Sequence, residues 1–163
     1  MPPPPEVTYR AWRPSDVPGM ITAVDLMSPE SVYWRLGIGA PRLPISYFRE
    51  VLDRAPEEWN AVLAESREEI VAWAEYARLA PGHPHADVAV IVTDPFQRRG
   101  VASRLLRKLR PLALRDGVRC FQARINSANR PALRTLESVL PSATPVERRH
   151  DEVEFLIDLS AFP

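Results

Sequence analysis

Several kinds of feature are scarce in this 163-residue sequence, and each shortage excludes a class of protein. The single cysteine, Cys120, rules out an internal disulfide framework and a zinc site built from cysteines. No apolar run approaches the roughly 20 residues of a membrane-spanning helix, and residues 1–30 lack the apolar core of a signal peptide. The 21 basic and 21 acidic residues cancel, which disfavours general binding to nucleic acids or anionic membranes. We therefore expect a cytoplasmic protein with no membrane or nucleic-acid partner.

Proline, in contrast, is abundant, with 18 residues in the chain, and it fills positions 2–5. Because such a run favours an extended polyproline helix outside a fold, we expect residues 1–5 to form a disordered leader. The remaining residues, 6–163, are of the length expected for a single domain with its own core.

The spacing of apolar residues predicts an alternation of strands and helices. The expected strands are 6–12, 59–65, 70–79, 88–92, 118–125, 147–149 and 152–159. The expected helices are 14–26, a short one from Ser28 carrying Tyr33 and Trp34, 45–55, 101–116 and 129–139. Pro111 should kink or shorten its helix, and Gly117 should end it. This order predicts an α/β fold with a mixed sheet.

The segment between the strand at 88–92 and the helix after Gly100 carries the clearest functional signal. Its residues are Gln97, Arg98, Arg99, Gly100, Val101, Ala102 and Ser103. Gly100 can adopt backbone conformations that other residues resist, and free N–H groups at a helix start bind phosphate. Arg98 and Arg99 lie at the positive end of the helix dipole, where a bound anion would offset their repulsion. The alternative interpretation is a helix with a solvated basic rim.

Other phosphate motifs do not fit this segment. It has no Gly-Lys-Ser/Thr ending of a P-loop, and one glycine cannot supply a Gly-x-Gly-x-x-Gly dinucleotide turn. The segment Gln97–Ala102, after a strand ending in Val-Ile-Val, instead resembles the acetyl-CoA signature Gln/Arg-x-x-Gly-x-Gly/Ala of the GNAT superfamily of N-acetyltransferases. The order of elements over 6–160 is similar to that family as well.

This resemblance implies a mixed, mostly antiparallel central sheet flanked by helices, with two strands splayed apart at the acetyl-CoA site. It implies that the turn amides of Arg98–Ser103 hold the pyrophosphate, and that the backbone of Val90, Ile91 and Val92 pairs with the pantetheine arm. Asn129 matches the family's frequent asparagine contact to that arm, and it is also a good helix N-cap. No metal is implied.

A narrower resemblance concerns the acceptor. Residues 28–35, SPESVYWR, and 86–90, ADVAV, are similar to the catalytic domain of bacterial protein-lysine acetyltransferases. Asp87 stands where that group commonly has a glutamate. A lysine-like amine is neutral in only about one molecule in a few thousand at pH 7, so a base must remove its proton. Asp87 is our candidate, acting through water; the alternatives are a solvated strand-end carboxylate, or His83 or His85 as the base.

The sequence departs from the family at the general acid. Many members have a tyrosine about seven residues after the asparagine, where this chain has Leu136. The thioester oxygen would receive hydrogen bonds from backbone N–H groups of the 90–92 strand. We expect an N-acetyltransferase that moves an acetyl group from acetyl-CoA directly to a primary amine, either a protein lysine or a small molecule. A non-catalytic acyl-CoA-binding regulatory module is the alternative, and a homodimer stays open.

Overall fold

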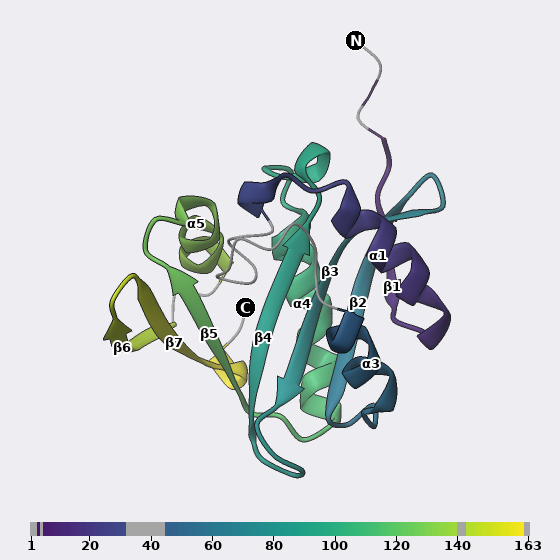
Figure 1. Ribbon diagram of the computed structural model, residues 1–163. Coiled ribbons are helices and arrows are strands. Elements are labelled where there is room, and N and C mark those ends of the chain that lie inside the picture. Colours follow the sequence, from purple (N-terminus) through teal and green to yellow (C-terminus); the bar gives the residue numbers. More distant parts are fainter. Residues whose placement is uncertain (1–2, 4, 32–44, 140–142, 162–163) are drawn as a thin grey trace.

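The computed structural model describes residues 3, 5–31, 45–139 and 143–161. Seven strands form one sheet, with helices between them (Figure 1). The strands are β1 (Thr8–Ala11), β2 (Trp59–Ser66), β3 (Glu69–Arg78), β4 (His85–Val92), β5 (Cys120–Asn126), β6 (Thr144–Arg149) and β7 (Glu152–Asp158). The helices are α1 (Val17–Asp25), α3 (Ile45–Asp53), α4 (Val101–Arg115) and α5 (Arg130–Val139), with short 3-10 turns η1 (Pro14–Asp16), η2 (Asp94–Phe96) and η3 (Leu159–Ala161).

The strand order is β1-β2-β3-β4-β5-β7-β6, and every neighbouring pair is antiparallel except β4 and β5. The prediction of a mixed, mostly antiparallel sheet is therefore confirmed. The parallel pair is short: His85, Ala86 and Asp87 face Cys120, Phe121 and Gln122, and no further pairs follow in the described strands. Beyond Asp87, β4 and β5 diverge, as the ribbon shows (Figure 1). The sheet is thus split between β4 and β5 from Asp87 to the C-terminal end of β4.

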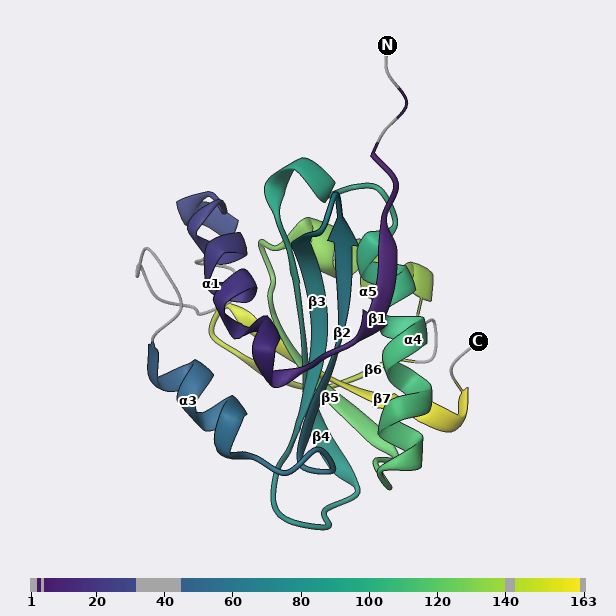
Figure 2. The ribbon, with the colours of Figure 1, turned by 90° about the vertical axis from the view of Figure 1, so that its right-hand side faces the viewer.

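Helices cover both faces of the sheet (Figure 2). On one face, α1 and α3 pack Met20, Val24 and Phe48 against Leu63, Trp73 and Ile91. On the other face, α4 lies against β2, β3 and β4, and α5 lies near it. The buried residues of α4 are Val101, Leu105, Leu106, Leu109 and Ala113, which form one stripe at helical spacing. Burial of each of the larger side chains contributes about 1.5–3 kcal/mol, which fixes the start of α4 beside the end of β4.

Several predicted boundaries need correction. β4 begins at His85 and not at residue 88, because the chain already pairs with β5 and β3 there. Asp87 therefore lies inside the strand. β6 begins at Thr144, not 147, and β1 is shorter than 6–12. Shortening of α4 at Pro111 was wrong: the helix continues to Arg115, since Pro111 lies on its exposed side, where water can satisfy the carbonyl left free.

Other expectations fall partly outside the described residues. Residues 29–31 are helical, as predicted from Ser28, but Tyr33 and Trp34 lie outside the described part of the chain. The same holds for residues 1, 2 and 4 of the expected leader. Gly117 has φ 90° and ends α4, which confirms its predicted role. Cys120 is free and half-buried.

Candidate active site

The turn from β4 into α4 presents backbone N–H groups without an internal partner. Gly100, the N-cap residue of α4, has φ 74° and no side-chain cap, and the first helical bond runs from the Arg104 N–H to the Gly100 carbonyl. The amides of Val101, Ala102 and Ser103 are thus the orphan donors of the first turn. Arg98 also has a positive φ, 61°, a strained conformation for a non-glycine residue. Two left-handed residues around Arg99 turn successive N–H groups into a concave anion-binding arrangement.

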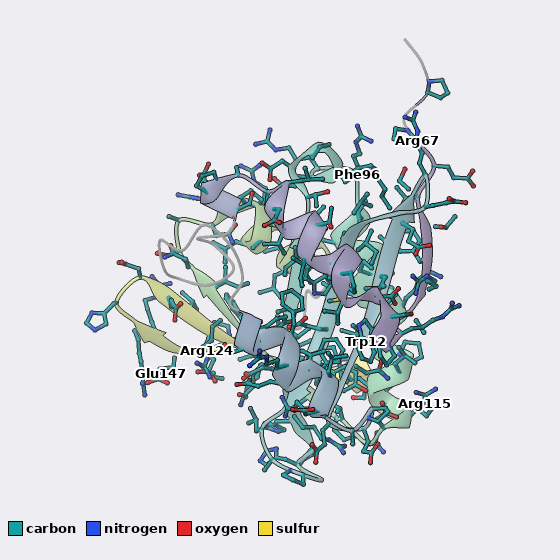
Figure 3. The ribbon with its side chains drawn as sticks, turned by 45° about the vertical axis from the view of Figure 1, so that its right-hand side comes forward. Trp12, Arg67, Phe96, Arg115, Arg124 and Glu147 are labelled. Carbon is teal, nitrogen blue, oxygen red and sulfur yellow. The ribbon has the colours of Figure 1, made fainter. Side chains whose placement is uncertain are left out.

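Positive charge surrounds this turn. Residues 97–100 are all exposed, and the guanidinium of Arg99 lies 5.3 Å from the centre of the Phe96 ring. Phe96 marks the position of the turn in Figure 3. The helix dipole and the two arginines therefore both favour the binding of an anion at this turn.

The divergence of β4 from β5 leaves one edge of β4 open. The Thr93 N–H donates to the Val71 carbonyl at 3.0 Å, and the His85 carbonyl accepts from Leu79, so odd-numbered residues of β4 bond to β3. Because hydrogen-bonding direction alternates along a strand, Val88, Val90 and Val92 direct their amides and carbonyls toward the β5 side. Ile91 bonds toward β3, and its side chain is only 2% exposed. Of the three predicted arm-binding residues, Val90 and Val92 direct their backbone groups toward the open edge and Ile91 directs its groups toward β3. Val88, which was not predicted, has the same direction as Val90.

Gln97 faces a different way from the anion turn. Its Nε2 lies 3.0 Å from the Val92 carbonyl, 3.1 Å from Ser31 Oγ and 3.2 Å from Asp94 Oδ1. The side chain thus braces the end of β4, and any contact of this residue with an anion would come from its backbone.

Asn129 has the local role that its residue type predicts. Its Oδ1 accepts a hydrogen bond from the Ala132 N–H at 3.3 Å, and its carbonyl accepts from Leu133, so it caps α5. Leu136, further along α5, is buried with 6% exposure. This position therefore supplies no hydroxyl group to a reaction.

Asp87 lies at the point where β4 and β5 separate. It pairs with Ala77 of β3 and Gln122 of β5, and its side chain is 49% exposed. Its Oδ1 is 4.0 Å from the guanidinium of Arg124 on β5. At about 3.3 Å per residue, Asp87 lies about 17 Å along β4 from Val92, where the strand ends and the chain leads on to the anion turn. An extended ligand along the open edge of β4 could span that length.

The two other candidate bases lie nearby but are held differently. His83 and His85 stack edge to face with 5.3 Å between ring centres, and His83 Nδ1 accepts the His85 N–H at 2.9 Å. His85 is part of β4, two residues before Asp87 and on the same face.

Glu75 is a buried carboxylate that the sequence analysis did not single out. It is 5% exposed on the Asp87 face of the sheet, between Ala61 and Ala89 on the adjacent strands. Its Oε2 accepts hydrogen bonds from Trp73 Nε1, at 2.9 Å, and from the Tyr47 hydroxyl of α3. The sequence contained a signal for this position, because Glu75 interrupts the apolar run from Ile70 to Ala77 in a strand that helices cover on both faces.

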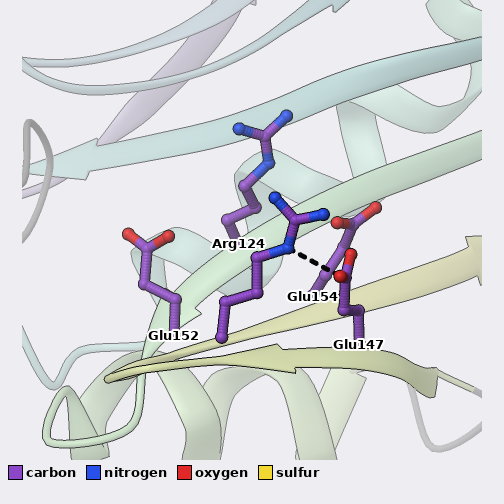
Figure 4. Close-up of a pocket in the computed structure, with 5 residues that line it drawn as sticks. Arg124, Glu147, Glu152 and Glu154 are labelled. Atoms are coloured by element: carbon purple, nitrogen blue, oxygen red, sulfur yellow. Dashed lines mark hydrogen bonds and ion pairs between the residues drawn. The ribbon is translucent and has the colours of Figure 1, made fainter.

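A hollow of about 310 Å³ adjoins this face on the last three strands. It is lined by Arg124, Glu147, Arg149, Glu152 and Glu154 (Figure 4). Arg149 Nε bonds Glu147 Oε1 at 2.6 Å, and Arg124 lies beside the β6–β7 hairpin (Figure 3). Ionised groups thus lie on the open face next to Asp87, with three carboxylates against two guanidinium groups.

No group of three or more metal-ligating side chains occurs among residues 3, 5–31, 45–139 and 143–161. In the same part of the chain, no helix is long and apolar enough to cross a membrane.

A helix start with uncapped N–H groups thus lies beside a split in the sheet, and a carboxylate, Asp87, lies where the two strands separate. Residues 25–140 match the sequence model of the acetyltransferase (GNAT) family, which is more than half of the chain. The protein belongs to this family and is an N-acetyltransferase. Among proteins with curated descriptions, none matches the sequence at a significant level.

Solved structures share the fold. The GNAT domain of the Streptomyces lividans protein PAT is 24% identical, with a TM-score of 0.84 over 93% of this chain and 90% of that one. The yncA protein of Salmonella typhimurium, solved with its cofactor acetyl-CoA, is 18% identical, with a TM-score of 0.75 over 94% of each chain. The ribosomal-protein-S18-alanine N-acetyltransferase of Escherichia coli is 14% identical, with a TM-score of 0.71 and the same coverage. At these identities the likeness shows the fold alone.

Proposed function

We propose that this protein binds acetyl-CoA at the β4–α4 turn and transfers the acetyl group directly to a primary amine, with Asp87 as the base. One observation carries the proposal. The uncapped N–H groups of Val101, Ala102 and Ser103 lie toward one end of the open edge of β4, and the Asp87 carboxylate lies at its other end, where β4 and β5 separate.

Two parts of the chain would bind acetyl-CoA, the acetyl donor. The N–H groups of Arg98–Ser103 and the dipole of α4 would hold the pyrophosphate. The open amide and carbonyl of Val90 and the amide of Val92, whose carbonyl accepts a hydrogen bond from Gln97, would hydrogen-bond an extended arm as a further strand would. Asn129, which follows β5 and caps α5, would contact that arm as well.

Asp87 would then act on the acceptor. Through an ordered water it accepts a proton from the ammonium group, because a charged amine has no lone pair for attack. The neutral nitrogen forms a C–N bond to the thioester carbonyl, whose oxygen gains negative charge and accepts a backbone N–H bond from β4. When the C–S bond breaks, the thiolate leaves. The nitrogen then loses its second proton, which leaves a neutral amide. Because Leu136 at the family's acid position has no group that could protonate the thiolate, this proton would reach the thiolate through water.

The acceptor would approach over the face of the sheet that carries Asp87, Glu75 and the charged hollow. The amine class includes protein lysines and small amines. The resemblance of residues 28–35 and 86–90 to lysine acetyltransferases supports the first.

The test measures thiol release from acetyl-CoA with peptides, polyamines, amino acids and aminoglycosides as acceptors. We expect turnover with at least one amine. Asp87→Asn should lower kcat about 10²–10⁴-fold, the range of general-base catalysis, while the Kd of acetyl-CoA changes less than about twofold. Unchanged turnover would remove Asp87 from this role. Tight binding of CoA without turnover on any amine would instead favour a regulatory acyl-CoA-binding module.

A further inference from the structure

The segment between β4 and α4 also forms hydrogen bonds with the start of a short helical stretch, residues 28–31, from a distant part of the sequence. Ser28 precedes helical residues 29–31, and its Oγ accepts the Ser31 N–H at 3.2 Å. Pro29 occupies the first helical position, where its missing N–H costs nothing. Ser28 is therefore an ordinary N-cap.

Asp94 completes this cap from 66 residues away in the sequence. Its Oδ2 accepts the Ser28 N–H at 3.0 Å, and its Oδ1 accepts the Ser31 hydroxyl at 2.8 Å. In a capping box, the third helical residue supplies the side chain that reaches back to the N-cap N–H. Ser31 holds that position here, and the carboxylate of Asp94 makes the bond instead. Its negative charge also suits a helix start.

Asp94 is also bonded to the segment that leads into the anion-binding turn. It is the first residue of η2, and Gln97 Nε2 lies within hydrogen-bond distance of Asp94, of Ser31 and of the Val92 carbonyl. The side-chain amide of Gln97 therefore links the end of β4, Asp94 and the Ser28–Ser31 cap. A movement of residues 94–97 would therefore also move the carboxylate that caps Ser28.

The capped stretch continues from α1, which lies over the sheet face that carries Asp87. α1 and Met27 pack against Trp73 and Ile91 on that face. We propose that Asp94 is a positioning residue that couples the two substrates: when the turn binds the donor, Asp94 fixes the Ser28–Ser31 cap, and the acceptor binds more tightly. This inference rests on the proposed function.

The size of the coupling follows from the bonds at stake. Two charge-assisted hydrogen bonds at an exposed to half-buried site support a coupling of about 5–20-fold between donor and acceptor affinity. By linkage, the same factor applies in both directions.

Initial-rate kinetics with both substrates varied give the coupling factor directly, as the ratio of acceptor dissociation constants without and with acetyl-CoA. We expect about 5–20 for the wild type and at most about 2 for Asp94→Asn. Ser31→Ala, which keeps the carboxylate, should give an intermediate factor, and the double variant should lose no more than Asp94→Asn alone. Glu57→Gln removes one exposed charge far from the turn and should keep the wild-type factor.

Amide hydrogen exchange with CoA as the probe keeps the inference testable without turnover. CoA should slow exchange at Ser28 and Ser31 in the wild type and in Glu57→Gln, but not in Asp94→Asn. A coupling factor near 1 in the wild type, or one that Asp94→Asn leaves intact, overturns the inference while the proposed function stands. Absence of turnover with every amine defeats the proposed function, and the exchange data then decide the coupling separately.

Discussion

Replacement of Gly100 by alanine separates the cost of backbone strain from the loss of donor binding. Gly100 has φ 74°, and a Cβ added there would meet no heavy atom within 4 Å. In the free protein, the cost of Gly100→Ala is therefore only that of holding an alanine in a left-handed conformation, about 1–2 kcal/mol of stability. For a domain of this size, that lowers Tm by roughly 2–8 °C, at about 2–4 °C for each kcal/mol.

Donor binding should suffer more than stability does. The added methyl group lies on the surface at which a pyrophosphate must approach the amides of Val101, Ala102 and Ser103. Loss of one charge-assisted hydrogen bond, about 1.5–3 kcal/mol, weakens CoA binding about 10–100-fold.

Gly82 offers a matched control in the turn before β4. It has φ 71°, and a Cβ there also meets nothing within 4 Å. Gly82→Ala should lower Tm by a similar amount and leave the Kd of CoA unchanged by calorimetric titration. Equal effects of the two variants on CoA affinity would refute the assignment of the turn as the anion site.

Two further predictions concern stability. In the β2–β3 turn, Arg67 (φ 52°) and Glu68 (φ 65°) are non-glycine residues in left-handed conformations. Because glycine adopts this conformation without strain, Glu68→Gly should raise the free energy of unfolding by about 1 kcal/mol in urea titrations. A lower free energy of unfolding would contradict the strain argument. Burial raises the pKa of Asp16, but hydrogen bonds from Arg10 and the Arg13 N–H outweigh it, and the net pKa is lowered. The resulting stabilisation is present above the unfolded pKa near 3.9 and is lost as pH falls through the folded value. Asp16→Asn should therefore destabilise most at neutral pH, and its difference from the wild type in free energy of unfolding should narrow below about pH 4. A difference that does not change with pH would contradict this.

The sequence was sufficient where a single residue type decides the local conformation. Gly100 and Gly117 both have the positive φ that their positions imply, and Asn129 caps its helix. The apolar stripe of α4 likewise predicted its buried face. These features depend on local sterics and hydrogen bonds, which short stretches of sequence contain.

Features that depend on contacts between distant strands were not predictable in the same way. Asp87 lies inside β4 because Ala77 and Gln122 pair with it, and neither partner is near it in sequence. Trp73 and Tyr47 donate hydrogen bonds to Glu75 and so help the core to tolerate this carboxylate. Asp94 acquires its cap contact from Ser28, 66 residues away. Pairing register and tertiary hydrogen bonds decide such positions, and composition and spacing do not reveal them.

The most direct test of the account is an amide chemical-shift titration of the ¹⁵N-labelled protein with CoA. We predict the largest shifts at the amides of Arg98–Ser103, with smaller shifts at Val90 and Val92 along the open edge of β4, and little change in the β6–β7 hairpin. Saturable binding that leaves the Arg98–Ser103 amides unshifted and perturbs another surface would contradict the central claim.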